Sequence, residues 1–120
     1  MTNPNAVGRI VRYAIAVGLF ALPVVADTTC TFQTECMEGE ACAESGFTLA
    51  IDAGGDIITP AETITAGEAL SSGEARAFSG ASSSGFHLVS IAGDGAARYS
   101  AHVPSAGLTI LYIGTCTETG

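Results

Sequence analysis

The residues that could do chemistry are densest between positions 35 and 44, where glutamates and cysteines crowd together. Carboxylate oxygens are the ligands that hard divalent cations prefer, and a disulfide here would hold them near one another. Their spacing is not that of an EF-hand loop, so a solvated acidic loop is expected. The alternatives are a divalent-cation site and a docking surface for a basic protein. The four glutamates are Glu35, Glu38, Glu40 and Glu44.

Two histidines form a second group, and each lies on a predicted strand beside the Gly93-Asp94-Gly95 turn. A hairpin centred on Asp94 places His87 opposite Ala101 and puts His102 on the same face as Arg98. Two histidines rarely make a metal site without a third ligand. We therefore expect surface histidines and no metal site.

Serine, histidine and aspartate occur together, so a hydrolase has to be considered. No G-x-S-x-G motif is present, and the sequence indicates no buried, oriented partners for a catalytic serine. The run Ser82-Ser83-Ser84 lies in a loop bounded by glycines and is typical of a flexible connector. We expect a protein that is not an enzyme and that uses no cofactor.

Aromatic residues form a third group, which small barrels can use to hold an apolar ligand. In a domain of this size we expect these side chains to fill the core instead. They are Phe32, Phe47, Phe78, Phe86, Tyr99 and Tyr112.

The four cysteines predict two disulfides in an exported chain, with three possible connectivities. A bridge between Cys36 and Cys42 requires a turn, because a helix would separate them by ~9 Å along its axis. Glu38-Gly39-Glu40 offers such a turn. Cys30 and Cys116 would then join the first strand to the last.

The elements that must position these residues are strands. Short segments rich in aromatic and β-branched residues are separated by clusters of Gly, Ser, Asp and Ala. Phe47, Leu49 and Ile51 alternate with their neighbours as in a half-buried strand. Other strands are predicted at 57–58, 76–79, 86–92, 97–103 and 108–116, with a loop at 80–85. Residues 60–72 fit a strand, a helical turn or a loop.

Seven or eight short strands predict an all-β fold, an antiparallel meander that forms a barrel or a sandwich. No linker divides the chain after residue 26. We therefore predict a single disulfide-bonded β domain over residues 27–120.

Residues 1–26 differ from the rest, because their only charges are Arg9 and Arg12 and the run from 13 to 25 is uncharged. Val24-Val25-Ala26 places small or β-branched residues where a signal peptidase reads. We predict a secretory signal peptide that is cleaved after Ala26. The alternative, a membrane anchor, needs ~20 apolar residues.

Removing the signal leaves Arg76 and Arg98 against twelve carboxylates, a formal net charge of −10. A polyanion cannot neutralise phosphates, which excludes nucleic acid and, after cleavage, an anionic membrane as partners. A cationic envelope protein is the partner that the charge favours. We expect a periplasmic or secreted location and leave the oligomeric state open.

A cysteine-bearing first strand and a last strand ending Gly114-Thr115-Cys116 resemble, in outline, small exported bacterial β-barrels of the lysozyme-inhibitor (MliC-like) family. The Ser-Gly-x-x-Tyr and Thr-Lys-Gly motifs of that family are absent, so no inhibitor residue is carried over. The segments 30–36 and 95–102 also resemble exported proteins with a C-T-F-x-T-E-C start and a later G-x-A-R-Y-S-x-H. That group brings no activity with it.

Together these features predict a non-enzymatic binding or inhibitory module that engages a cationic partner through its acidic face. A divalent-cation-binding protein and a structural envelope protein are the alternatives.

Overall fold

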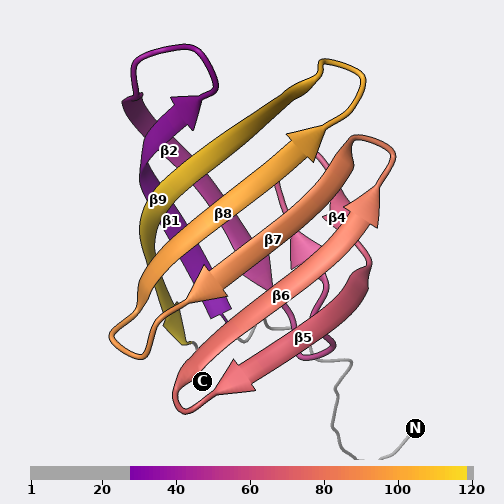
Figure 1. Ribbon diagram of the computed structural model, residues 1–120. Helices are drawn as coiled ribbons and strands as arrows, with labels where there is room; N and C mark the ends of the chain where they lie inside the picture. The colour runs from indigo at the N-terminus through magenta and orange to yellow at the C-terminus, as the bar shows by residue number, and fades with distance from the viewer. Residues whose placement is uncertain (1–27, 119–120) are drawn as a thin grey trace, which may run out of the picture.

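The computed structural model describes residues 28–118, which form nine antiparallel strands (Figure 1). The predicted all-β fold with two disulfides is confirmed, and the sheet curls into a nearly closed barrel. The predicted signal peptide, residues 1–26, lies outside the described residues. The strands are β1 (Thr28–Met37), β2 (Ala43–Ile51), β3 (Ile57–Ile58), β4 (Thr63–Ile64), β5 (Ala66–Ser72), β6 (Ala75–Ser82), β7 (Gly85–Ile91), β8 (Ala96–Val103) and β9 (Leu108–Glu118).

The strands follow the order β4-β3-β2-β1-β9-β8-β7-β6-β5, so the first and last strands pair in the middle of the sheet. The two edge strands, β4 and β5, are consecutive in the chain and are separated only by Thr65. This short connection brings the two edges together, and β4 lies against β6. The two edges of the sheet are therefore held together by the covalent connection through Thr65, and β4 and β5 do not pair with each other.

The seam between the two edges passes over Gly80 on β6. A Cβ atom at this position would lie 2.5 Å from the carbonyl oxygen of Thr65 and 2.8 Å from Cγ2 of Ile64. Real side chains do not approach backbone this closely, so only glycine lets the chain cross here.

The core lies inside the barrel and follows the two-residue period of the strands. On β1 the buried residues are Thr28, Cys30 and Phe32, while Thr29 and Thr31 are exposed. The predicted alternation on β2 is confirmed, since Leu49 is 3% and Ile51 1% exposed. Burying a side chain of this size stabilises the fold by roughly 1.5–3 kcal/mol.

Two disulfides link Cys30 to Cys116 and Cys36 to Cys42. The first joins directly opposed residues of β1 and β9 inside the barrel. Its sequence separation is 86, against 6 for the second. In the chain-entropy model the long loop contributes roughly 4.5 kcal/mol and the short one roughly 2.

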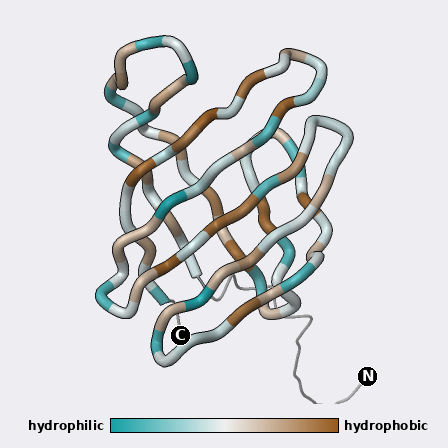
Figure 2. The backbone as a smooth tube through the Cα atoms, viewed as in Figure 1, coloured by the Kyte–Doolittle hydropathy of each residue, from teal (hydrophilic) through white to brown (hydrophobic). Residues whose placement is uncertain are grey.

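The strands define two ends of the barrel. We call one the Cys36 end, because it carries the β1–β2 hairpin with its disulfide, and it also carries the β3–β4, β6–β7 and β8–β9 turns. We call the other the terminal end, because Thr28 and Glu118 pair there. Hydrophilic stretches gather mainly at these two ends (Figure 2).

Two sequence predictions about the strands need correction. The predicted loop at 80–85 is mostly strand, because Gly80 and Ser82 pair with His87 and Gly85, leaving only a tight turn. Nine strands form rather than seven or eight, since residues 60–72, which fitted three structures, contain both β4 and β5. Within residues 28–118 no helix is long and apolar enough to span a membrane.

Candidate functional site

The four glutamates of the acidic segment lie on the β1–β2 hairpin at the Cys36 end. Glu38 ties this hairpin to β9, because the N–H of Thr109 donates to Glu38 Oε1 at 3.0 Å and the N–H of Glu38 donates to the Thr109 carbonyl. Glu40 and Glu44 are exposed. Within the described part of the chain, no side-chain hydrogen bond holds either carboxylate, so both are free to meet a partner.

Glu35 differs from the other three because it faces the barrel aromatics. It pairs in register with Tyr112 on β9. Burial is the main cause that raises the pKa of the Tyr112 hydroxyl, and the charge of Glu35 raises it further. Glu35 therefore places negative charge beside half-buried rings at the Cys36 end.

The glutamates do not form a preassembled metal site. Among residues 28–118, no three His, Cys, Asp or Glu side chains come close enough to hold one metal ion. The hairpin spreads its carboxylates along two strands and a turn, whereas calcium takes six to eight oxygen ligands. The hairpin is a surface of separated charges.

The histidines do not share an environment, and the expectation that both lie at the surface is wrong for His87. His87 is only 6% exposed, whereas His102 is exposed and lies beside the hydroxyl of Thr109. The predicted register is correct, since His87 pairs with Ala101. Because neighbouring positions point to opposite faces, this register turns His87 inward with Val89.

His87 is the centre of a chain of polar contacts. Its Nδ1 lies 2.8 Å from the hydroxyl of Tyr99, and its Nε2 lies 3.0 Å from Ser82 Oγ and 3.3 Å from Ser84 Oγ. The two serine oxygens are 2.8 Å apart, and the Ser84 hydroxyl donates to Glu62 Oε2 at 2.6 Å. We call this set the His87 chain. The predicted flexible serine connector is thus an ordered turn.

The two ends of the His87 chain differ in their protonation. At one end, Glu62 accepts: the Ser84 hydrogen bond holds the pKa of its carboxyl below the usual value. At the other end, burial raises the pKa of Tyr99 to about 12, so this hydroxyl keeps its proton. Within the described chain, His87 Nδ1 is the hydrogen-bond partner of the Tyr99 hydroxyl.

Burial lowers the pKa of His87, and the Glu62 charge opposes this only in part. The ring is therefore neutral at pH 7, and in a neutral imidazole one nitrogen donates a hydrogen bond while the other accepts one. Nδ1 faces Tyr99, and Nε2 faces the two serines.

The His87 chain also has a mechanical role. Glu62 lies in the β3–β4 turn, whereas Ser82 and Ser84 belong to the β6–β7 hairpin. Their contacts therefore join the two sides of the seam at the Cys36 end. Sequence reasoning did not find this group, because Glu62, Ser84 and Tyr99 carry no shared motif and are far apart in the chain.

Aromatic side chains fill the barrel interior beside His87, as expected for five of the six. Phe47 stacks on Tyr112 with ring centroids 4.7 Å apart, and Tyr99 stacks on Tyr112 at 5.4 Å. Phe32 is fully buried among them. Phe86 is the exception, because it is 63% exposed on the outer wall: the register that turns His87 inward turns Phe86 outward.

The carboxylates are divided between the two ends of the barrel. Strands β6, β7 and β8 contain neither Asp nor Glu, and among residues 28–118 Glu68 on β5 is the one carboxylate away from both ends. The Cys36 end carries Glu35, Glu38, Glu40, Glu44 and Glu62, and the terminal end carries Asp52, Asp56, Glu74, Asp94 and Glu118. We call the first set the Cys36 rim.

Comparison with known proteins finds no matching family model, curated protein or solved structure. The structure shows a small antiparallel β-barrel, and no family is identified.

Proposed function

We propose that this protein is a non-enzymatic binding module of inhibitor type that engages a cationic partner protein through the Cys36 rim. The observation that carries the proposal is the arrangement of charge: five carboxylates share this rim, and neither arginine of residues 28–118 lies among them. Arg76 bridges Glu118 at the terminal end, and Arg98 lies on the outer wall of β8. Neither arginine therefore pairs with a carboxylate of the rim.

The two acidic ends differ in how their carboxylates are used. At the terminal end, Asp52 accepts N–H groups of its own turn, Asp56 accepts the N–H of Ala66, and Asp94 accepts that of Ala96. These carboxylates stabilise turns. At the Cys36 end, Glu40 and Glu44 have no such task, which favours the rim as the contact surface.

Preorganisation also favours the rim. The Cys36–Cys42 disulfide holds the β1–β2 hairpin, and Glu38 fixes it to β9. A surface that is rigid before binding loses less conformational entropy when a partner docks. Two proteins with oppositely charged surfaces also associate faster, and salt weakens this effect.

The two disulfides indicate an oxidising environment outside the cytoplasm. We extend this to a periplasmic or secreted location, with the partner in the same compartment. The architectural likeness to lysozyme-inhibitor barrels supports an inhibitor-type role, although no inhibitor motif is present in this sequence.

The test compares two variants that remove four charges each from opposite ends. One carries Glu35→Gln, Glu38→Gln, Glu40→Gln and Glu44→Gln; the other carries Asp52→Asn, Asp56→Asn, Glu74→Gln and Asp94→Asn. Amides keep an oxygen that accepts the structural hydrogen bonds. Each protein is immobilised, exposed to an envelope extract at low and high salt, and its bound proteins are identified by mass spectrometry.

We expect the wild type and the terminal-end variant to capture the same basic protein at low salt, and the rim variant to lose it. High salt should release the partner from both. Equal capture by the two variants, or capture that high salt leaves intact, contradicts the proposal.

A further inference from the structure

A groove runs across the outer wall of β5, β6, β7 and β8, away from the His87 chain and the Cys36 rim. Its volume is 540 Å³, within the roughly 300–1,000 Å³ range of small-molecule sites. Two rungs of side chains cross the four strands in register. They are Leu70, Ala77, Ser90 and Arg98, followed by Ser72, Ala75, Ala92 and Ala96.

The groove is apolar and is shaped by small residues. Ala75, Ala77 and Ala96 make most of its floor, so the wall is hollow where larger side chains would fill it. Leu70 stands at the β5 side and is 66% exposed. A second, smaller hollow continues past Leu70 and Ala77 to Leu88, which is 47% exposed. The apolar surface therefore extends beyond the groove itself.

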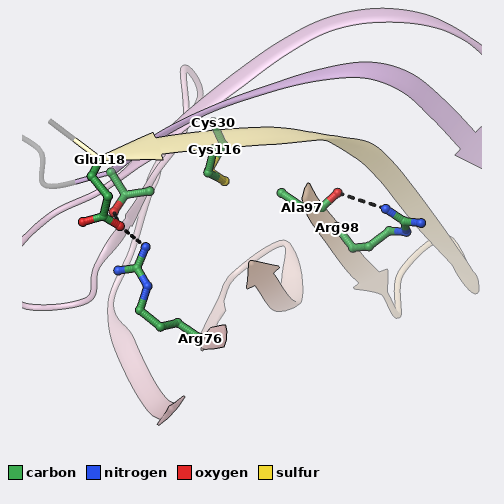
Figure 3. Close-up of a disulfide and its surroundings, with 7 residues drawn as sticks. Cys30, Arg76, Ala97, Arg98, Cys116 and Glu118 are labelled. Atoms are coloured by element: carbon green, nitrogen blue, oxygen red, sulfur yellow. Dashed lines mark hydrogen bonds and ion pairs between the residues drawn. A yellow bond between two sulfur atoms is a disulfide. The ribbon is translucent and has the colours of Figure 1, made fainter. Parts of the chain in front are cut away.

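The opposite side of the groove carries an unpaired cation. Within residues 28–118, the one hydrogen bond of the Arg98 guanidinium goes to the carbonyl oxygen of Ala97, at 3.3 Å. Arg76, in contrast, ion-pairs with Glu118 at the terminal end (Figure 3). Although Arg76 borders the groove, alternation along β6 turns its side chain to the other face.

Charge complementarity selects the occupant. The lining residues include no carboxylate, in a protein whose residues from 27 onward carry a net charge of −10. Guanidinium groups match carboxylates in a bidentate, planar geometry. A large polyanion would meet the acidic ends of the barrel, but a small ligand with one negative charge would touch only this wall.

We propose that the groove binds a free fatty acid of medium chain length, with its carboxylate on Arg98 and its aliphatic chain across the alanine floor toward Leu70. Three strand spacings separate β8 from β5, about 14 Å, which suits an extended medium-length chain. The ligand buries the exposed Leu70 at the β5 side, and its head group gives the unpaired guanidinium a partner.

The test is calorimetric titration of the purified protein with dodecanoate below its micelle concentration. We expect one equivalent to bind, with amide shifts in the NMR spectrum confined to β5–β8. Arg98→Gln should weaken dodecanoate binding by about tenfold or more, the loss expected for a charge-assisted hydrogen bond. His102→Gln, a control on the same face of β8 but outside the groove, should leave the affinity unchanged.

Two further variants test the groove rather than the charge. Ala77→Phe and Ala96→Phe each fill the floor from the outer wall, and both should abolish binding. Circular dichroism establishes that each variant is folded, and a folded variant that still binds dodecanoate overturns the proposal.

Two other ligands separate the alternatives. Dodecyltrimethylammonium has the same chain with a cationic head, so binding as tight as that of dodecanoate overturns the role of Arg98. Co-sedimentation with phosphatidylglycerol vesicles that Arg98→Gln abolishes would assign the groove to a lipid surface and overturn the free fatty acid as its occupant. Absence of any dodecanoate heat and shift also overturns the proposal.

Discussion

At the scale of single residues, His87 is a buried ionisable side chain with a polar contact at each ring nitrogen. It is stacked on Tyr99, which lies at Nδ1, while Ser82 lies at Nε2. The neutral ring can satisfy both contacts, because one nitrogen donates and the other accepts, whereas a second ring proton would remove the accepting nitrogen. The imidazole therefore connects β7 to β8 and to the β6–β7 hairpin.

This environment makes stability depend on pH in a defined direction. The folded protein lowers the pKa of His87 below the ordinary value of 6.5, so the unfolded chain takes up a proton first as pH falls. Protonation thus favours unfolding, and the stability that the neutral ring contributes is lost as pH falls from about 6.5 through the lower pKa of the folded protein. We expect the free energy of unfolding, measured with urea, to decrease as pH falls below about 6.5.

His87→Gln should flatten this slope, because the amide does not titrate. His102→Gln is the control, since that side chain is exposed. The Glu62 carboxyl, whose pKa is lowered from 4.5, acts in the same direction but in a separate, more acidic range. Identical slopes for the wild type and His87→Gln would contradict the assigned role of His87.

The sequence could predict the partner of His87 across the hairpin but not its burial. On β7, Phe86 and Leu88 alternate with His87 and Val89, so each face of the strand carries large apolar residues. Periodicity alone cannot choose between two such faces. The choice is made by tertiary packing, which brings Tyr99 and the seam to the inner face.

At the scale of elements, the seam is the unusual feature of the barrel. Its edges do not form a continuous ladder of backbone hydrogen bonds. They are held by the Thr65 connection, by the contact of Ile64 with Gly80, and by the Glu62–Ser84 hydrogen bond. Gly80 lies on β6, next to the edge strand β5, and its lack of a side chain lets Ile64 and Thr65 approach.

Gly80→Ala tests the seam directly. The added methyl group would meet the Thr65 carbonyl and Ile64, so the edges must separate. Overpacking of this kind costs about 1–3 kcal/mol, which we expect as a loss of unfolding free energy in urea. Gly46→Ala on β2 is the control, because nothing lies within 4 Å of its added Cβ. Equal stability of the two variants would show that the seam is not tightly packed.

The sequence predicted the individual strands and hairpins better than the way in which the sheet closes into a barrel. Alternation located β2, and the Gly93–Gly95 turn located the β7–β8 hairpin with its correct register. Segment 60–72 gave no single prediction, because its Ala and Gly residues are poor strand formers and it shows no helical period. Its structure is imposed by the closing of the barrel, a long-range contact that local sequence patterns do not contain.

At the scale of the whole molecule, the carboxylates of residues 28–118 gather at the two ends of the barrel. Between the ends, strands β6, β7 and β8 carry none. The carboxylates of the Cys36 rim repel one another, as do those of the terminal end, and this repulsion destabilises the folded state. Salt screens it, with a Debye length of about 10 Å at 0.1 M. The same arrangement separates the surface proposed for a cationic protein from the groove proposed for a fatty acid.

We expect the melting temperature to rise as sodium chloride is added from low ionic strength, by about 4–8 °C for each kcal/mol of repulsion removed. The four-fold glutamine variant of the rim should melt higher at low salt and respond less to salt. Choline chloride in place of sodium chloride should give the same rise if screening is the cause. A melting temperature that salt leaves unchanged would contradict this account of the rims.

The pairing of β1 with β9 has a consequence for the order in which the chain can fold. The first strand finds its partner only when the last strand is available, and Cys30 can be oxidised to Cys116 only then. Contacts of such long sequence separation make folding slow. A chain that becomes available from its N-terminus onward thus cannot complete the barrel until residue 116 is available. The β1–β2 hairpin can form early, whereas the closed barrel forms in a late step that joins the two ends of the described chain.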